Sequence, residues 1–252
     1  MMINNIKFFI RSFLISISDL VFTIKPRGLK IKDYLYLIFM PTRYQSLKFK
    51  DGSILKKKCS DNIIDNFEKM KLLNIDNFYK SYLDIGCSEG TFLIEAFLNN
   101  CKDITGIDIQ DNRLKVAQIL IKNWKCSDNI KLIKTDVRKF KTNKKFDVVT
   151  CLSVGHHFHG NRNHDTWNIL NNKERFSEEY NNIIAFFRKI SELTKKYAYI
   201  EYCYEFDNKI TNFNEHLLSK EISKLKIFRE FVYLKYTQKS TNKLRILYLG
   251  TN

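Results

Sequence analysis

The chain has 252 residues, of which 44% are hydrophobic, and this length provides for one α/β domain with its own core and an N-terminal appendage. Its six cysteines form no CxxC pair and no Cys/His cluster with metal-ligand spacing, so we expect buried reduced thiols, no structural disulfide and no metal site. The formal net charge of +16 comes mostly from lysine and not from arginine, the preferred residue for bidentate phosphate recognition, so charge alone does not indicate a nucleic-acid partner.

Residues 1–40 contain apolar side chains at helical spacing, from Ile6 to Ile24. Lys7, Arg11 and Asp19 interrupt this segment, so it falls short of an uncharged membrane span of ~20 residues. A small-residue cleavage site typical of a secretory signal is missing. Three interpretations stay open: a helix that packs on the core or closes a pocket, an amphipathic helix on a membrane surface, or a dimerisation helix. We expect a cytoplasmic protein, with peripheral membrane contact as an alternative.

The next segment connects this appendage to the main domain. A second apolar run, Tyr34–Met40, ends at Pro41, and Lys50–Ser53 predicts a turn. Ser60 and Asp61 offer an N-cap for a helix over residues 62–73. We therefore divide the chain into an N-terminal helical extension, residues 1–60, and a main domain, residues 61–252.

The most informative stretch is a strand, a loop and a helix between Tyr82 and Phe97. The apolar strand ends with Asp84, Gly86 and Gly90 bound a short loop, and a helix begins near Thr91. The two glycines permit a tight turn in which a ligand approaches the backbone. A dinucleotide site would place a pyrophosphate here, where the negative charge of Asp84 opposes it. The loop therefore suits a ligand that carries an ammonium group and no phosphate.

This sequence, Asp84-x-Gly86-x-Ser88-x-Gly90, resembles the first motif of class I S-adenosylmethionine (SAM)-dependent methyltransferases. That family usually has glycine at the position of Ser88. The resemblance implies an α/β three-layer sandwich with a seven-stranded, mostly parallel, Rossmann-like sheet and an antiparallel C-terminal hairpin. It also implies a methyltransferase enzyme with SAM as cofactor, whose methionine moiety is held by Asp84 and the loop.

A second acid, Asp108, follows at a sequence spacing that suits a ribose ligand. Residues 103–109 indicate a buried strand that closes on Asp108, 24 residues after Asp84. Two ribose hydroxyls can both donate hydrogen bonds to one carboxylate at such a strand end. Asp108 could alternatively cap the helix predicted over residues 112–122. The spacing from Asp84 favours ribose binding.

Two further strands complete the cofactor site that the resemblance implies. The strand at 130–137 ends at Asp136, which the family places beside the adenine, with Val137 as an apolar neighbour. The strand at 146–153 ends at Ser153, facing the place where methyl donor and acceptor meet. The residues that we assign to the cofactor on this basis are Asp84, Gly86, Cys87, Ser88, Gly90, Asp108, Ile109, Asp136, Val137 and Ser153.

Four histidines follow within nine positions, from 156 to 164. An oxygen acceptor must lose a proton, and a histidine is suited to accept it near neutral pH. We assign His156 or His157 as the catalytic base, with His159 and Asp165 as acceptor contacts. Two alternatives stay open: these histidines shape the pocket without reacting, or they bind zinc, for which His-x-His without cysteine is weak evidence.

The pattern of the C-terminal part predicts the remaining strands of the sheet and one helix. A helix is predicted over 176–193 and a strand over 197–202, and Glu201 and Tyr204 near its carboxyl end are assigned to the acceptor. Two β runs, 227–236 and 244–249, resemble the antiparallel hairpin of class I methyltransferases. The resemblance thus extends over about residues 60–252.

These observations predict a methyltransferase that acts by direct in-line displacement on oxygen or nitrogen of a small or glycan-like polar acceptor. One alternative is an RNA (tRNA or rRNA) methyltransferase, which would explain the charge, although an AT-rich coding sequence would give the same lysine excess. The other is a non-catalytic SAM-binding or membrane-associated protein. The acceptor cannot be named from the fold.

Overall fold

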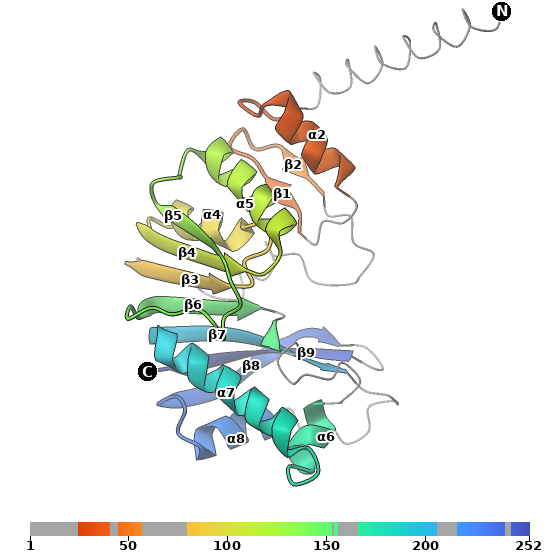
Figure 1. Cartoon of the computed structure of the whole chain (residues 1–252), viewed down its shortest axis with the longest axis vertical. Coiled ribbons are helices and arrows are strands. Elements are labelled where there is room, and N and C mark those ends of the chain that lie inside the picture. Colours follow the sequence, from red (N-terminus) through yellow and green to blue (C-terminus); the bar gives the residue numbers. More distant parts are fainter. Residues whose placement is uncertain are drawn as a thin grey trace, which may run out of the picture.

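The computed structural model describes residues 25–40, 45–56, 80–152, 154–155, 166–205, 216–239 and 243–252. A seven-stranded sheet in the order β5-β4-β3-β6-β7-β9-β8 runs through the molecule (Figure 1). Its strands are β3 (Ser81–Ile85), β4 (Asp103–Asp108), β5 (Ile130–Lys134), β6 (Phe146–Leu152), β7 (Thr194–Glu205), β8 (Glu230–Lys239) and β9 (Lys243–Thr251). The strands from β5 to β7 pair in parallel, and β9 is antiparallel to both β7 and β8. The predicted fold class is confirmed.

Helices lie on both faces of this sheet because successive side chains of each strand point to opposite faces. In β3, Tyr82 belongs to one hydrophobic cluster, together with apolar residues of α4 (Thr91–Leu98) and α5 (Asp111–Trp124). Leu83 belongs to the other cluster, with residues of α6 (Thr166–Asn171), α7 (Ser177–Leu193) and α8 (Leu217–Lys224). The buried strands thus form the middle layer of the predicted three-layer sandwich.

The longest helix, α7, follows from its sequence pattern. Ile183, Ile184, Phe187 and Ile190 recur at helical spacing, and all four are buried against the sheet. Acidic residues occupy its first turn, where the positive end of the helix dipole stabilises their negative charge. The predicted range of 176–193 agrees with the observed helix to within one residue. By contrast, the short helices α6 and α8 were not predicted.

The described part of the N-terminal extension, residues 25–40 and 45–56, packs against α5. It contains α2 (Ile31–Phe39) and a small hairpin of β1 (Leu47–Lys48) and β2 (Ile54–Leu55), whose turn includes the predicted Asp51-Gly52. The Lys50 amide donates to Asn123 Oδ1 at 2.9 Å, and Trp124 Nε1 donates to the Lys48 carbonyl at 2.9 Å. Residues 25–56 therefore share the core of the main domain.

Two helices predicted for this region cannot be compared with the structure. The helical segment from Ile6 to Ile24 and the helix predicted at 62–73 lie outside the described residues. Among the described helices, none combines the length and apolar character needed to cross a membrane.

Candidate functional site

The loop between β3 and α4 is fixed over the carboxyl end of β4. The amides of Gly86 and Cys87 both donate to the Ile107 carbonyl, at 2.8 and 3.0 Å. Gly86 has φ +74°, a left-handed conformation that favours glycine. A Cβ at this position would lie 2.3 Å from Val154 Cγ2, so glycine is also required for packing against the chain after β6.

The end of the loop contacts α5 just as closely. Gly90 has φ +80°, and a Cβ there would lie 2.9 Å from the Ala117 Cβ. Between the two glycines, Ser88 adopts φ +48° without being glycine, at a cost of roughly 1–2 kcal/mol. Its hydroxyl donates to Glu89 Oε2 at 2.8 Å, which offsets part of this cost. The loop is therefore held by its own packing before any ligand is bound.

A buried ion pair connects this loop to α5. Glu89 Oε1 accepts from the Arg113 guanidinium, and the two side chains are 0% and 4% exposed. Sequence reasoning did not single out either residue. A signal was present, since Arg113 falls on the same face of the helix as the buried Val116, Ala117 and Leu120. Because breaking such a pair leaves a buried charge uncompensated, it fixes the loop relative to the helix.

Asp108 is placed at the end of β4, directly beside the loop. Its Oδ2 accepts the Ser88 amide at 2.9 Å, and its Oδ1 accepts the Gln110 amide at 2.8 Å. A carboxylate has about four acceptor sites, so sites remain for a ligand. The side chain is only partly buried, and the neighbouring Ile109 is 63% exposed. The structure therefore brings together Ser88 and Asp108, as expected from the sequence.

Asp84 lies deeper, one strand away. Thr150 Oγ1 donates to its Oδ1 at 2.7 Å, so the Tyr82 hydroxyl, 2.6 Å from Thr150 Oγ1, acts as the donor in that contact. Among the described residues, Asp84 Oδ2 has no hydrogen-bond partner although it is fully buried. Burial raises the pKa of the Asp84 carboxyl to about 7, and the nearby charge of Asp108 adds to this effect while the Thr150 hydrogen bond opposes it.

This buried acid is the unusual feature of the site. An unpartnered carboxylate oxygen is costly unless a donor reaches it. Asp84 is 2% exposed, so this oxygen is shielded from bulk water. A ligand cation would supply both the missing hydrogen bond and the charge that favours ionised Asp84.

Other predicted cofactor residues have partners within the protein. Cys87 is buried, and a Cβ on Gly106 would lie 2.9 Å from its Sγ, so its side chain packs against β4. Asp136 follows β5 and binds the Arg138 guanidinium, whose hydrogen bond holds the pKa of this carboxyl below its usual range. Val137 is buried in the hydrophobic core.

The two predicted acceptor residues on β7 also contact other side chains of the protein. Glu201 is fully buried, with its Oε2 3.5 Å from Arg245 Nη1, and the Tyr204 hydroxyl lies 2.7 Å from that of Tyr248. Their assignment to the acceptor stays a prediction. The remaining assigned residues lie outside the described part of the chain; they are Ser153, His156, His157, His159 and Asp165. Within the described part, no group of three or more His, Cys, Asp or Glu residues could hold a metal ion.

Comparison with known proteins gives one match over most of the main domain. Residues 78–241 match the family model described as "Methyltransferase domain". An 80-residue stretch is 38% identical to the ubiquinone biosynthesis O-methyltransferase of Saccharophagus degradans, over 31% of this chain and 33% of that protein. A 76-residue stretch is 34% identical to the 23S rRNA (cytidine-2'-O)-methyltransferase TlyA of Campylobacter jejuni, over 29% of this chain and 27% of that protein. The matches thus cover at most a third of these relatives' length.

Solved structures extend the likeness of the fold to nearly the whole chain. The N-terminal domain of EvdMO1, determined in the presence of SAH and D-fucose, superposes with a TM-score of 0.60 at 14% identity, covering 90% of this chain and 99% of that domain. The bifunctional kinase-methyltransferase WbdD superposes with a TM-score of 0.54 at 16% identity, covering 87% of this chain and 46% of WbdD. At such identities these structures share the fold.

Proposed function

The chain belongs to the methyltransferase domain family, and from this premise we propose that it methylates an oxygen or nitrogen atom of a small or glycan-like polar acceptor. It is a SAM-dependent methyltransferase with a Rossmann-like fold. Its cofactor is SAM, which supplies an electrophilic methyl group on a sulfonium centre. The acceptor and the residues that carry out each task are the proposed part.

The observation that carries the cofactor assignment is the pair of acids at the ends of β3 and β4. The two backbone amides that orient Asp108 leave acceptor sites for ribose hydroxyls. Asp84 Oδ2 is buried and lacks a partner among the described residues, which fits an ammonium group such as that of the methionine moiety. We assign the adenine to Asp136 and the exposed Ile109, with Arg138 holding the Asp136 carboxylate in place.

The chain's own part in the reaction is alignment and proton removal. Methyl transfer is an in-line displacement, so positioning of the acceptor atom supplies much of the rate. We propose His156 or His157 as the base that takes the acceptor proton. β6 ends at the same edge of the sheet as Asp84 and Asp108, and both histidines follow within five residues of that end in the sequence. His159, Asp165, Glu201 and Tyr204 are proposed acceptor contacts.

We propose oxygen as the acceptor atom and a sugar-like molecule as the acceptor. Two curated relatives are named as O-methyltransferases, and one solved neighbour was determined in the presence of D-fucose. The segment from 156 to 167 is rich in histidine and asparagine, which favours a hydroxyl-rich ligand.

Transfer of labelled methyl from SAM tests the proposal directly. The protein and an extract of its source would be incubated with SAM labelled on its methyl group, and small molecules, glycans, RNA, protein and lipid would be separated. We expect label in the small-molecule or glycan fraction, and its loss with Asp84→Asn. Label in RNA would contradict this acceptor, and absence of label despite SAM binding in calorimetry would favour a non-catalytic SAM-binding protein.

RNA is the second candidate acceptor. One curated relative is named for 23S rRNA, and residues 131–145 of this chain carry seven lysines and arginines against one acid. Label recovered in tRNA or rRNA, with binding that weakens steeply as salt rises, would support it.

Peripheral membrane contact through residues 1–40 is a further proposal. Ile31 and Phe39 on α2 are 43% and 72% exposed, beside the exposed Lys32. Flotation with anionic vesicles would test it: we expect the full chain to float and an Ile31→Asp/Phe39→Asp variant to float less. A full chain that stays at the bottom of the gradient would contradict this contact.

A further inference from the structure

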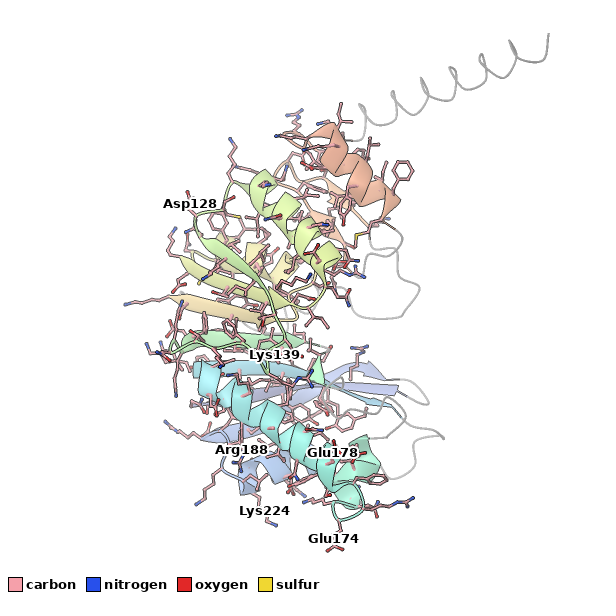
Figure 2. All side chains as sticks on the ribbon, viewed as in Figure 1. Asp128, Lys139, Glu174, Glu178, Arg188 and Lys224 are labelled. Atoms are coloured by element: carbon pink, nitrogen blue, oxygen red, sulfur yellow. The ribbon has the colours of Figure 1, made fainter. Side chains whose placement is uncertain are left out.

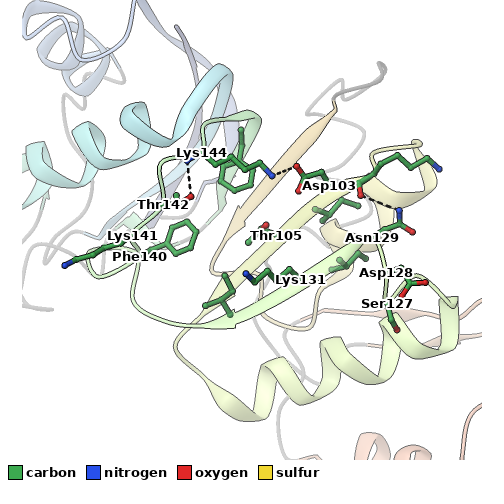
Figure 3. A pocket seen from close by; sticks show the side chains of 15 residues that line it. Asp103, Thr105, Ser127, Asp128, Asn129, Lys131, Phe140, Lys141, Thr142 and Lys144 are labelled. Atoms are coloured by element: carbon green, nitrogen blue, oxygen red, sulfur yellow. Dashed lines mark hydrogen bonds and ion pairs between the residues drawn. The ribbon is translucent and has the colours of Figure 1, made fainter.

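A groove on the sheet opens at the amino ends of β4 and β5, at the opposite end of β4 from Asp108 (Figure 3). It has a volume of about 620 Å³ and exists because the connection from β5 to β6, residues 135–145, forms no helix that would cover this part of the sheet. We propose that the groove and this connection bind the phosphodiester backbone of RNA. The inference goes beyond the proposed acceptor, because RNA held here need not be methylated.

The floor of the groove carries a buried polar group and a cation side by side. Thr105 is 6% exposed and lies in register with Lys131 on the neighbouring strand. Both line the groove, and Figure 3 shows them on adjacent strands with Phe140 across from them. Within the described part of the chain the Thr105 hydroxyl makes no hydrogen bond. A phosphate oxygen placed here could accept from the Thr105 hydroxyl and the Lys131 ammonium.

Lysines surround this floor in excess over acids. Lys102, Lys131 and Lys141 are exposed lining residues that form no ion pair among the described residues. Lys144 is different, since it pairs with Asp103 and its ammonium lies 4.4 Å from the centre of the Phe146 ring. Among the described residues, the groove therefore presents three lysines without an ion pair against one such exposed acid, Asp128.

The charge also extends past the groove, which indicates a polymer and not a single phosphorylated molecule. Residues 131–145 contain seven lysines and arginines and one acid, whereas the whole chain has 43 and 27. Figure 2 shows Lys139 on this connection, and Lys139 is not one of the residues that line the groove. Three of the seven, Lys134, Arg138 and Lys144, pair with acids. Lys139 and Lys145 form no ion pair among the described residues and add to the unpaired Lys131 and Lys141 of the groove, which fits a ligand with one negative charge per nucleotide.

The aromatic side chains of the groove favour backbone contacts over base stacking. Phe140 and Phe146 are 7% and 2% exposed, so neither presents a ring face on which a base could stack. Contacts to phosphates position a nucleic acid without reading its sequence. We therefore expect binding that depends on salt and charge, with little preference for sequence.

Fluorescence anisotropy with a labelled RNA hairpin tests the inference on the full chain. The groove variant is Lys131→Glu/Lys141→Glu, and the control is Lys220→Glu/Lys224→Glu on α8, which changes the net charge equally. In the view of Figure 2, Lys224 lies near the lower end of the molecule, far below the groove residue Asp128. We expect roughly tenfold weaker RNA binding and a salt dependence smaller by about two phosphate contacts in the groove variant alone.

Three outcomes would overturn the inference. They are equal losses in both variants, no RNA binding by the unaltered protein, and groove-dependent binding of dextran sulfate without RNA binding, which would assign the groove to an anionic polysaccharide. SAM affinity equal to that of the unaltered protein shows that a variant is folded, because none of the substituted lysines belongs to the cofactor site. Lys131→Gln/Lys141→Gln, which adds no acid, must show a smaller loss in the same direction.

Discussion

At the scale of single residues, Asp84 combines a cost in stability with a proposed role in binding SAM. Its pKa of about 7 exceeds the ordinary value of 3.8, chiefly because of burial. The folded state therefore holds a proton that the unfolded state releases near pH 4. The contribution of Asp84 to the free energy of unfolding is fully present below about pH 4, the pKa of the group in the unfolded chain. It falls as pH rises and is lost above about pH 7, the pKa of the group in the folded protein. A bound cation would reverse this loss by favouring the ionised form.

The variant Asp84→Asn separates these two effects. Without SAM at pH 8 we expect it to be more stable than the unaltered protein, by up to ~4 kcal/mol, because the amide has no charge to bury. Near pH 4 the two should be similar. Its SAM affinity should fall despite the gain in stability. Urea unfolding between pH 4 and 8 measures the first effect, and a parallel pH profile for both proteins would contradict the raised pKa.

At the scale of elements, the loop and α5 fit together through Gly90. This position and Gly52 both have positive φ, +80° and +86°, so alanine costs backbone strain at either. Only at Gly90 would the new Cβ meet another atom, 2.9 Å away on Ala117, while nothing lies within 4 Å at Gly52. The two sites therefore separate strain from packing.

We expect Gly90→Ala to destabilise the protein more than Gly52→Ala and to weaken SAM binding as well. Gly52→Ala should cost about 1–2 kcal/mol of stability and leave SAM affinity unchanged. Thermal unfolding and calorimetry of both variants provide the comparison. Equal effects on SAM affinity would show that the contact between loop and helix does not shape the site.

Elements with strong local patterns were predictable. The strands that end at Asp84 and Asp108 are short apolar runs closed by an acid, and the structure places both acids at strand ends. The pair Glu89–Arg113 was missed, because a sequence shows that charges exist but not that the fold buries them together. The hairpin of β1 and β2 was read only as a turn, since each strand has two residues and depends on α5 for its packing.

At the scale of the whole molecule, the described residues of the extension, 25–40 and 45–56, are part of the folded core. Leu37 is fully buried in the cluster that contains α4 and α5 residues, whereas Phe39, on the same helix, is 72% exposed. The boundary predicted at residue 60 stays a prediction, and residues 25–56 bury apolar surface across it. The sequence shows an apolar run at Tyr34–Met40 but neither that it forms a helix nor which element it covers.

Leu37→Ala should lower the free energy of unfolding by about 2–5 kcal/mol, as expected for a large buried side chain. Phe39→Ala, the control on the exposed side, should change it by less than about 0.5 kcal/mol. Urea denaturation of both variants measures this difference. A small effect of Leu37→Ala would mean that the extension contributes little to the core.

Calorimetric titration of SAM into the protein and into Asp108→Ala is the most direct measurement, because Asp108 links the loop, the strand end and the proposed ribose contact. The control is Asp111→Ala, which removes an exposed carboxylate three residues away that pairs with Lys115. Asp108→Ala is predicted to weaken SAM binding tenfold or more, ~1.4 kcal/mol or above, while Asp111→Ala binds normally. Unchanged SAM affinity in Asp108→Ala would contradict the site proposed here.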